Sequence, residues 1–159
     1  MTDRPTPLPS ADRLDECELR AWRGLLEAHA VLYGALDSQL QAEHGLSLSQ
    51  YEVLKVVRDA PSGQMRMADV ADRVLLSRSG LTRLVDRLVC TGLLERRACP
   101  SDARGALAHL TPLGRERLDA ARRTHLEGVR RLFLSQLAPE EQERLGDLWE
   151  RVVGRVAVA

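Results

Sequence analysis

The sequence predicts a mainly α-helical protein that carries one small antiparallel β hairpin. Most of the chain places apolar residues three and four positions apart, which is the period of an amphipathic helix. Residues 93–97 and 106–110 flank the turn-forming segment CPSDARG, an arrangement typical of two short paired strands. Aromatic residues make up only 3% of the chain, so the interior must consist mostly of Leu, Val and Ala, which suits helices.

The charge of the chain is balanced overall but unevenly distributed. A length of 159 residues favours one domain, or one domain with a dimerisation element. The net charge of zero argues against a generally basic nucleic-acid-binding surface. Residues 1–65 carry 6 basic and 10 acidic groups, residues 66–105 carry 8 and 5, and residues 106–159 carry 9 and 8. Any affinity for nucleic acid should therefore follow the local positive field at the centre of the chain.

The first part of the chain predicts a tail followed by a long helix. Residues 1–12 are polar and hold three prolines, so we expect a disordered tail. A wide apolar stripe from about residue 14 to residue 43 predicts one helix, which Gly45 ends. The next helix is capped by Ser47 or by Ser49, and Ser49 has the spacing of a capping box with a glutamate three residues later.

Two short helices joined by about three residues come next. The first has apolar residues at the helical period: Met67, Val70, Ala71 and Val74. The second begins at Ser77, a good N-cap, and ends at Gly92, which can adopt a left-handed conformation. Its apolar residues follow the same period: Leu81, Leu84, Val85, Leu88 and Val89. This pair predicts a helix-turn-helix.

The opposite face of the second helix is polar and basic. Its outward positions hold the side chains Arg78, Ser79, Thr82, Arg83, Asp86 and Arg87. Arginines and small hydroxyls at the exposed start of such a helix contact base edges in a DNA major groove, although a solvated face also carries charge. Ser77 and Ser79 are alternatively capping residues, and for Ser77 capping is the better interpretation. Asp86 either orients Arg83 or Arg87, or limits nonspecific binding to phosphates.

The predicted hairpin adds a second basic element. Arg104 lies near its tip, where a guanidinium can enter a narrow minor groove, and Asp102 can hold that guanidinium through paired hydrogen bonds. Arg96 and Arg97 contact either phosphate or solvent. With the hairpin as a wing, residues 46–111 are predicted to form a winged helix-turn-helix DNA-binding domain.

Two further helices are predicted after the hairpin. Thr111 followed by Pro112 begins the first, and Pro139 begins the second. The last helix has an apolar stripe too wide for one neighbour: Leu145, Leu148, Trp149, Val152, Val153 and Val156. We therefore expect residues 13–45 and 112–157 to form a helical dimerisation region buried against a second copy. A twofold dimer would suit DNA half-sites about one helical turn, roughly 10 bp, apart.

Three segments between Leu46 and Leu118 form one continuous pattern: LSLSQYEVL, MADVADRVLLSRSGLTRLVDRLVCTGLLERR and SDARGALAHLTPLGRERL. With them the chain resembles the MarR family of bacterial winged-helix regulators. The most specific marker is D-x-R-G, followed by an apolar strand and L-T-x-x-G. The resemblance implies a homodimeric transcription regulator, most often a repressor. Such a regulator binds a pseudo-palindromic operator on double-stranded DNA and releases it when a small molecule or an oxidant is sensed.

The resemblance also implies an effector pocket between the dimerisation helices and the DNA-binding domain. In this region the chain has five suitable side chains: Trp22, His29, Tyr33, Tyr51 and His125. Their flat apolar faces and polar tips would suit a small aromatic or phenolic anion. Each of them is alternatively an ordinary core residue at helical spacing.

The cysteines offer an alternative mode of sensing. Cys17, Cys90 and Cys99 form no paired motif, which fits a reduced cytoplasm. The peroxide-sensing branch of the family has its reactive cysteine nearer to the position of Leu25, so Cys17 does not match it. A redox-responsive regulator is kept as an alternative function.

Other classes of function find little support. No nucleophile–base pair, phosphate-binding glycine loop or metal cluster is evident, so we expect no enzyme activity, no cofactor and no metal site. The zinc-responsive branch uses an H-x-x-x-H pair in its fifth helix, whereas His125 stands alone there. No segment is apolar enough to cross a membrane. The last alternative is a winged-helix module that binds protein instead of DNA, and the exposed arginines argue against it.

Overall fold

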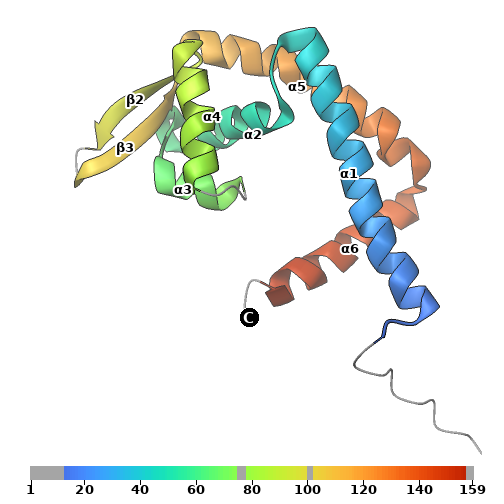
Figure 1. Ribbon diagram of the computed structural model, residues 1–159. Helices are drawn as coiled ribbons and strands as arrows, with labels where there is room; N and C mark the ends of the chain where they lie inside the picture. The colour runs from blue at the N-terminus through green and yellow to red at the C-terminus, as the bar shows by residue number, and fades with distance from the viewer. Residues whose placement is uncertain (1–12, 75–77, 100–101, 157–159) are drawn as a thin grey trace, which may run out of the picture.

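The computed structural model of the chain is mostly helical and describes residues 13–74, 78–99 and 102–156, with the backbone alone at 78–79, 99, 102–105 and 155–156. Along the chain the elements are α1 (Glu16–His44), α2 (Leu48–Asp59), η1 (Pro61–Gly63), β1 (Gln64–Arg66), α3 (Met67–Arg73), α4 (Arg78–Cys90), β2 (Leu94–Cys99), β3 (Asp102–Leu110), α5 (Pro112–Leu132), η2 (Leu134–Gln136) and α6 (Pro139–Val156) (Figure 1). The predicted fold class, mainly α with a small antiparallel wing, is confirmed. The predicted tail at residues 1–12 lies outside the described residues.

Helix α1 is one unbroken helix, as the apolar stripe predicted. Asp15 caps its start, because the Asp15 carboxylate accepts from the backbone N–H of Glu18 at 2.8 Å and the Glu18 carboxylate accepts from the N–H of Asp15 at 2.8 Å. Gly45 ends the helix in the left-handed region, and its N–H donates to the carbonyl of Gln41 at 3.0 Å.

Ser47, one of the two predicted candidates, caps helix α2. Its hydroxyl accepts from the backbone N–H of Gln50 at 3.2 Å, and the Gln50 side chain accepts from the N–H of Ser47 at 2.9 Å. The predicted capping box that begins at Ser49 is therefore wrong. The hydroxyl of Ser49 lies 2.6 Å from the hydroxyl of Tyr33, so Ser49 joins α2 to α1 instead.

The wing belongs to a three-stranded antiparallel sheet in the order β1-β3-β2. Strand β1, three residues long, pairs with the end of β3 and is absent from the sequence prediction. The hairpin strands β2 and β3 are also longer than predicted, with an irregularity of register between Ala98 and Cys99. Asp102 and Arg104 therefore lie within strand β3, whereas the prediction placed them in the tip.

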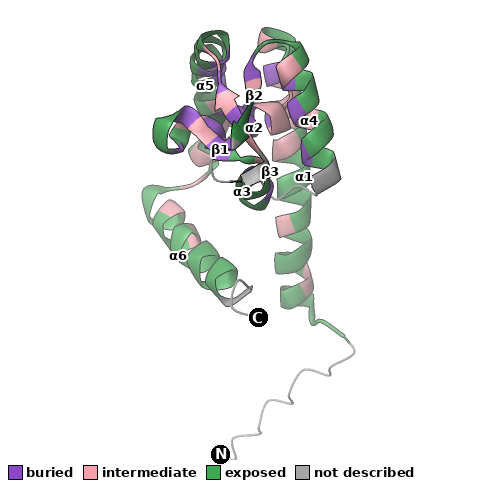
Figure 2. Cartoon of the chain, turned by 90° about the vertical axis from the view of Figure 1, so that its left-hand side faces the viewer, coloured by how far each residue is buried: buried purple, intermediate pink, exposed green. Residues whose placement is uncertain are grey.

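The hydrophobic core runs from the end of α1 to the middle of α5, and residues 40–121 are called the lobe below. Its largest fully buried side chains are Leu40, Leu54, Leu81, Leu88, Leu94, Leu118, Val53, Val57, Val70 and Val85. Figure 2 shows this buried zone in purple. Apolar side chains from every helix of the lobe meet here, so their burial supplies the main driving force for folding.

The remaining helices, residues 16–39 and 122–156, are called the stem. Helices α1 and α5 cross closely at Gly128, where an added Cβ atom would lie 2.7 Å from Leu36 Cδ2 and 2.9 Å from Gln39 Oε1. Figure 1 shows α6 turning back after α5 and running apart from the lobe, and Figure 2 shows it almost entirely green, that is, exposed. None of the described helices is long and apolar enough to span a membrane.

Candidate nucleic-acid interface

Helices α3 and α4 form the predicted helix-turn-helix. Helix α4 ends at Cys90, and the chain turns at Gly92, which has a φ of 72° and donates its N–H to the carbonyl of Val89 at 2.9 Å. The next residue, Leu93, donates to the carbonyl of Leu88 at 2.9 Å, so the chain reverses directly from α4 into β2. This sharp reversal places the wing beside α4.

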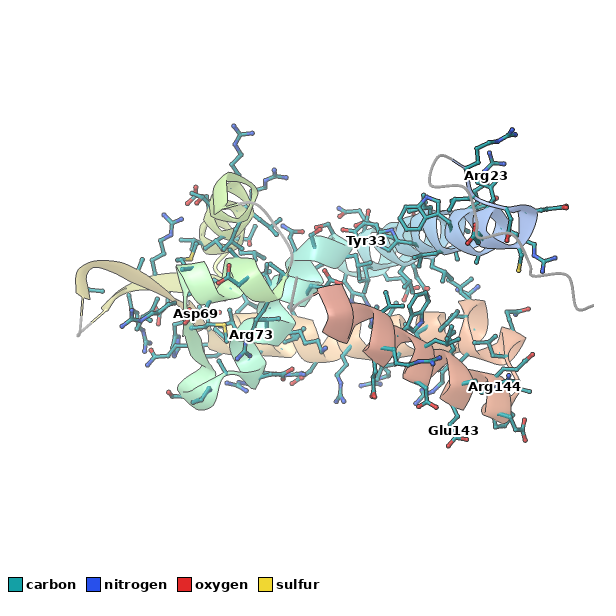
Figure 3. All side chains as sticks on the ribbon, turned by 90° about the horizontal axis from the view of Figure 1, so that it is seen from below. Arg23, Tyr33, Asp69, Arg73, Glu143 and Arg144 are labelled. Carbon is teal, nitrogen blue, oxygen red and sulfur yellow. The ribbon has the colours of Figure 1, made fainter. Side chains whose placement is uncertain are left out.

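Helix α4 presents one apolar face and one polar face. Leu81, Val85 and Leu88 are buried and Leu84 and Val89 are half-buried, as the helical period predicted. The opposite face exposes Thr82, Arg83, Asp86 and Arg87, all of which were predicted as DNA-contacting residues. Figure 3, seen from below, shows side chains with nitrogen tips extending from α4 away from the rest of the lobe. Ser77 and the side chains of Arg78 and Ser79 lie outside the described residues.

Asp86 pairs with the wing. Its carboxylate lies 2.8 Å from the guanidinium of Arg96 on β2, and both side chains are 40% exposed or more. Asp86 therefore pairs with Arg96 and does not orient Arg83 or Arg87, as one of the two interpretations had predicted. No periodicity of α4 could have identified Arg96, because the two residues are ten positions apart and meet only after the turn at Gly92.

Arg97, predicted as a wing residue, is held along strand β2. Its Nε donates to Glu95 Oε1 at 2.8 Å. The same carboxylate oxygen lies 3.1 Å from Nδ1 of His109, which is the residue opposite Glu95 on β3. Arg97 still exposes about half of its side chain. The side chains of Asp102 and Arg104, the other predicted wing residues, lie outside the described residues.

Four of the five predicted effector residues form two ring pairs, and Trp22 lies apart from them. The rings of His29 and Tyr33 lie 5.9 Å apart on α1, and those of Tyr51 and His125 lie 4.6 Å apart between α2 and α5. Trp22 is 53% exposed, and eleven positions along the helix place it roughly 16 Å from Tyr33. Tyr51 is 3% exposed and belongs to the core, which was its alternative interpretation.

Two charged residues of α2 were missed by the sequence analysis. Glu52 and Lys55 line a hollow of about 200 Å³ together with Val56, Arg73 and Val74, and Arg73 is labelled on α3 in Figure 3. Burial raises the pKa of Glu52, while Lys55 and His29 partly oppose that rise. Lys55 is the only lysine of the chain, but this is a compositional fact that does not indicate a location.

His125 has an unusual environment. Burial lowers the pKa of its imidazole, and the charge of Lys55 lowers it further. The buried Nδ1 atom of His125 has no hydrogen-bond partner among the described residues. Its neutral form is therefore favoured.

A metal centre is not indicated in the part of the chain that the structure describes, where no group of three or more His, Cys, Asp or Glu side chains is placed to hold an ion. Cys17 and Cys90 are free and exposed. The side chain of Cys99 is outside the described residues.

The exposed polar face of α4, the preceding helix α3 and the adjoining β-wing together define a winged helix-turn-helix DNA-binding protein. A profile described as MarR family matches residues 44–105. The structure resembles that of AbsC, a MarR family transcriptional regulator from Streptomyces coelicolor, with a TM-score of 0.86, 32% identity and coverage of 92% of this chain and 99% of AbsC. The chain belongs to the MarR family of transcription regulators.

Two other relatives agree with this assignment. Sco3205, a MarR family regulator from Streptomyces coelicolor whose structure is in complex with DNA, has a TM-score of 0.84 and 35% identity, with 89% of each chain covered. YkoM of Bacillus subtilis, an uncharacterised HTH-type transcriptional regulator, is 34% identical over 103 residues. That match spans 65% of each chain, just under two thirds. The relatives are transcription regulators, and one of them has been solved in complex with DNA, which places this chain among DNA-binding transcription regulators and not among enzymes.

Proposed function

We propose that the protein is a homodimeric repressor that binds a pseudo-palindromic operator and releases it when a small aromatic or phenolic anion binds. The observation that carries the dimer is the exposed apolar surface of the stem. On α6, Leu148 and Trp149 are 46% and 39% exposed, and Val152 and Val153 are also exposed. On α1, Trp22 and Leu26 are exposed in the same way. A water-soluble regulator buries such a surface, and a second copy of the stem would cover it.

A hollow between α1, α5 and α6 supports the same proposal. It has a volume of about 400 Å³ and is lined mostly by apolar residues: Ala21, Gly24, Leu25, Ala28, His29, Leu32, Phe133, Leu145 and Trp149. An apolar helix from a second stem would fill it. In the proposed dimer the exposed Trp22 belongs to the dimer surface. The effector contacts residues nearer to the lobe, and His29 lies at the boundary between this hollow and the effector site.

For the DNA interface we propose two sets of contacts. The side chains of α4 enter the major groove: Arg78, Ser79, Thr82, Arg83 and Arg87. The wing contributes Arg97 and Arg104, with Asp102 orienting Arg104, while Asp86 fixes Arg96 beside the groove. The DNA complex of Sco3205 supports a DNA-binding role for the same fold. Since the target is a chromosomal operator, we place the protein in the cytoplasm.

Arginine substitutions on α4 test the DNA interface. If Arg83 contacts bases, R83A should weaken operator binding by roughly 1–3 kcal/mol, measured by fluorescence anisotropy at fixed salt. R23A is the matched control, because Arg23 is an exposed arginine on α1 at the end of the molecule away from the lobe (Figure 3). Equal affinity of R83A and R23A for the operator would overturn this placement of the DNA interface.

We propose that the effector binds at the junction of α1, α2 and α5. His29, Tyr33 and His125 offer ring faces and polar tips there, Tyr51 supports His125 from the core, and Lys55 supplies a positive charge. The observation that favours this place is the buried and unpartnered Nδ1 of His125.

The probes for this site are benzoate and 4-hydroxybenzoate. Each should release the operator from the wild-type protein, and K55M should weaken this response by roughly tenfold or more, because a charge-assisted contact is lost. K55M should bind the operator normally without a probe. Release of the operator at the same probe concentration from K55M and wild type would contradict the assignment of Lys55.

A further inference from the structure

A continuous set of hydrogen bonds joins α1 to α5 where the stem leaves the lobe. His44 Nε2 lies 2.8 Å from the hydroxyl oxygen of Thr124, and this hydroxyl donates to Glu43 Oε2 at 3.0 Å. The second carboxylate oxygen of Glu43 accepts from the Gln39 side-chain amide at 3.2 Å. The carbonyl oxygen of Gln39 accepts from Arg131 at 3.3 Å. The set crosses between the two helices at three of its four steps.

Thr124 has a single hydroxyl proton, and this fixes which groups donate and which accept in the set of hydrogen bonds. Hydrogen bonds from Gln39 and Thr124 hold the pKa of Glu43 below its usual value, so Glu43 is an ionised acceptor at neutral pH. Thr124 must then donate its only proton to Glu43 and accept from His44, which requires the proton of the neutral imidazole to lie on Nε2. Every group has one defined role, so the set forms in one register of α1 against α5.

The position of this set gives it a mechanical role. Leu40 is the one described buried residue of α1, while Leu118 and Ala121 of α5 are in the lobe core, so the set lies where both helices leave that core. Thr124 is itself buried, at 8% exposure, and Gly128 lets the helices approach closely one turn further along. Arg117 adds a bond from α5 to the carbonyl of His44 at 3.0 Å.

We infer that Thr124, together with Glu43 and His44, is a positioning residue that fixes the angle between the stem and the lobe. In this way it sets the separation of the two α4 helices of the dimer for operator binding. Apolar packing is not directional and allows one helix to slide or rotate on another, whereas these bonds do not. The inference rests on the proposed dimer, because the angle matters only when two lobes must contact one DNA duplex together.

The test compares T124V, which removes the hydroxyl and keeps the shape, with T124S, which keeps the hydroxyl. T124V should reduce operator affinity by roughly 3- to 30-fold, the range expected for substitutions that alter coupling between distant sites. Its affinity for random duplex DNA, where one lobe can bind through phosphates alone, should stay within about twofold of wild type. T124S should bind the operator as the wild type does. Thermal unfolding and light scattering on each variant ensure that folded dimers are compared.

A second measurement needs no DNA. Long-range ¹H–¹⁵N spectra should show the Nε2–H tautomer for neutral His44 in the wild type and T124S. In T124V the ring loses its acceptor, and this pattern should change. An unchanged operator-to-random affinity ratio in T124V, an equal loss in T124S, or an Nδ1–H tautomer of His44 in the wild type would each overturn the inference. A wild-type protein that binds no operator would instead overturn the proposed function.

Discussion

Asp86 carries the opposite charge to its neighbours on the exposed face of α4. Its carboxylate lies within hydrogen-bond distance of Arg96 on the wing, at 2.8 Å. Because both side chains are largely exposed, water and salt screen the pair, and its contribution to folding is less than about 1 kcal/mol. Its value is therefore in orientation, since it holds a wing arginine beside the helix that contacts DNA.

Removing this carboxylate should make DNA binding less selective. D86N leaves Arg96 unpaired and adds one unit of positive charge to the DNA-binding face, so affinity for random duplex should rise about two- to tenfold at low salt. The slope of log affinity against log salt should become steeper. D72N is the matched control, because Asp72 is an exposed aspartate on α3. Random-DNA affinity of D86N no higher than that of D72N would refute this role.

The lowered pKa of His125 predicts that the stability of the folded protein depends on pH. Its pKa in the folded protein is below the ordinary 6.5, first because of burial and then because of Lys55. As the pH falls below 6.5, the unfolded chain takes up the proton before the folded protein does, so the stability from this residue is present above 6.5 and is lost as the pH falls through the folded pKa.

The measurement is urea unfolding between pH 5 and 8, with H125Q as the reference. The free energy of unfolding of the wild type should exceed that of H125Q most at pH 8, and the difference should shrink at lower pH. NMR titration of the His125 ring should give a pKa below 6.5. A ring that titrates at or above 6.5 would show that the imidazole is solvated.

Helix α6 is exposed along most of its length and packs only loosely against the rest of its own chain. Its apolar residues are spaced for a helix with two neighbours, yet Leu148, Val152 and Val153 remain exposed. In contrast, α4 buries Leu81, Val85 and Leu88 within the lobe. The same apolar periodicity therefore leads to a core in one helix and, in our proposal, to a dimer interface in the other.

A charge placed on α6 should disrupt the proposed dimer. L148E should shift the protein toward the monomer by at least tenfold in the dissociation constant, because a carboxylate must be desolvated in the interface. The control is L113E on α5, where Leu113 is 48% exposed compared with 46% for Leu148. Analytical ultracentrifugation measures both variants. If L113E and L148E associate equally well, α6 is not the interface.

Local patterns in the sequence predicted elements well where neighbours along the chain determine them. The stripe of α4, the N-cap Thr111 and the stop at Gly92 all depend on residues within one or two turns. Strand β1 was missed because three residues show no alternation, and it exists only by pairing with β3. Ser47 and Ser49 are both possible caps locally, and contacts with α1, from Tyr33 to Ser49 and from Asp37 to the backbone N–H of Leu48, accompany the choice of Ser47.

The residues of the candidate site were likewise predictable only where neighbours along the chain determine them. The exposed positions of α4 follow from its helical period, since burial of one face determines the other. The pairing of Asp86 with Arg96, and the location of Lys55 near His125, depend on segments that meet only in the folded chain. The separation of Trp22 from Tyr51 follows from how far α1 extends beyond the lobe, which no local pattern contains.

As a whole, the molecule has a lobe that presents α4 and a stem that we propose pairs with a second copy. Local basic charge attracts the lobe to DNA, but it does not select one sequence. Selection by two lobes requires that both α4 helices meet the major groove at once, at a separation set by the stem. The protein should therefore be sensitive to the spacing of half-sites as well as to their sequence.

The measurement is the affinity of the wild-type protein for its operator and for the same operator with 5 bp inserted between the half-sites. The insertion rotates one half-site by about half a turn and moves it by roughly 17 Å, so one rigid dimer cannot contact both. We predict a loss of affinity to the level of random duplex DNA for the longer operator. Equal affinity for the two operators, or binding by a monomer, would contradict the account.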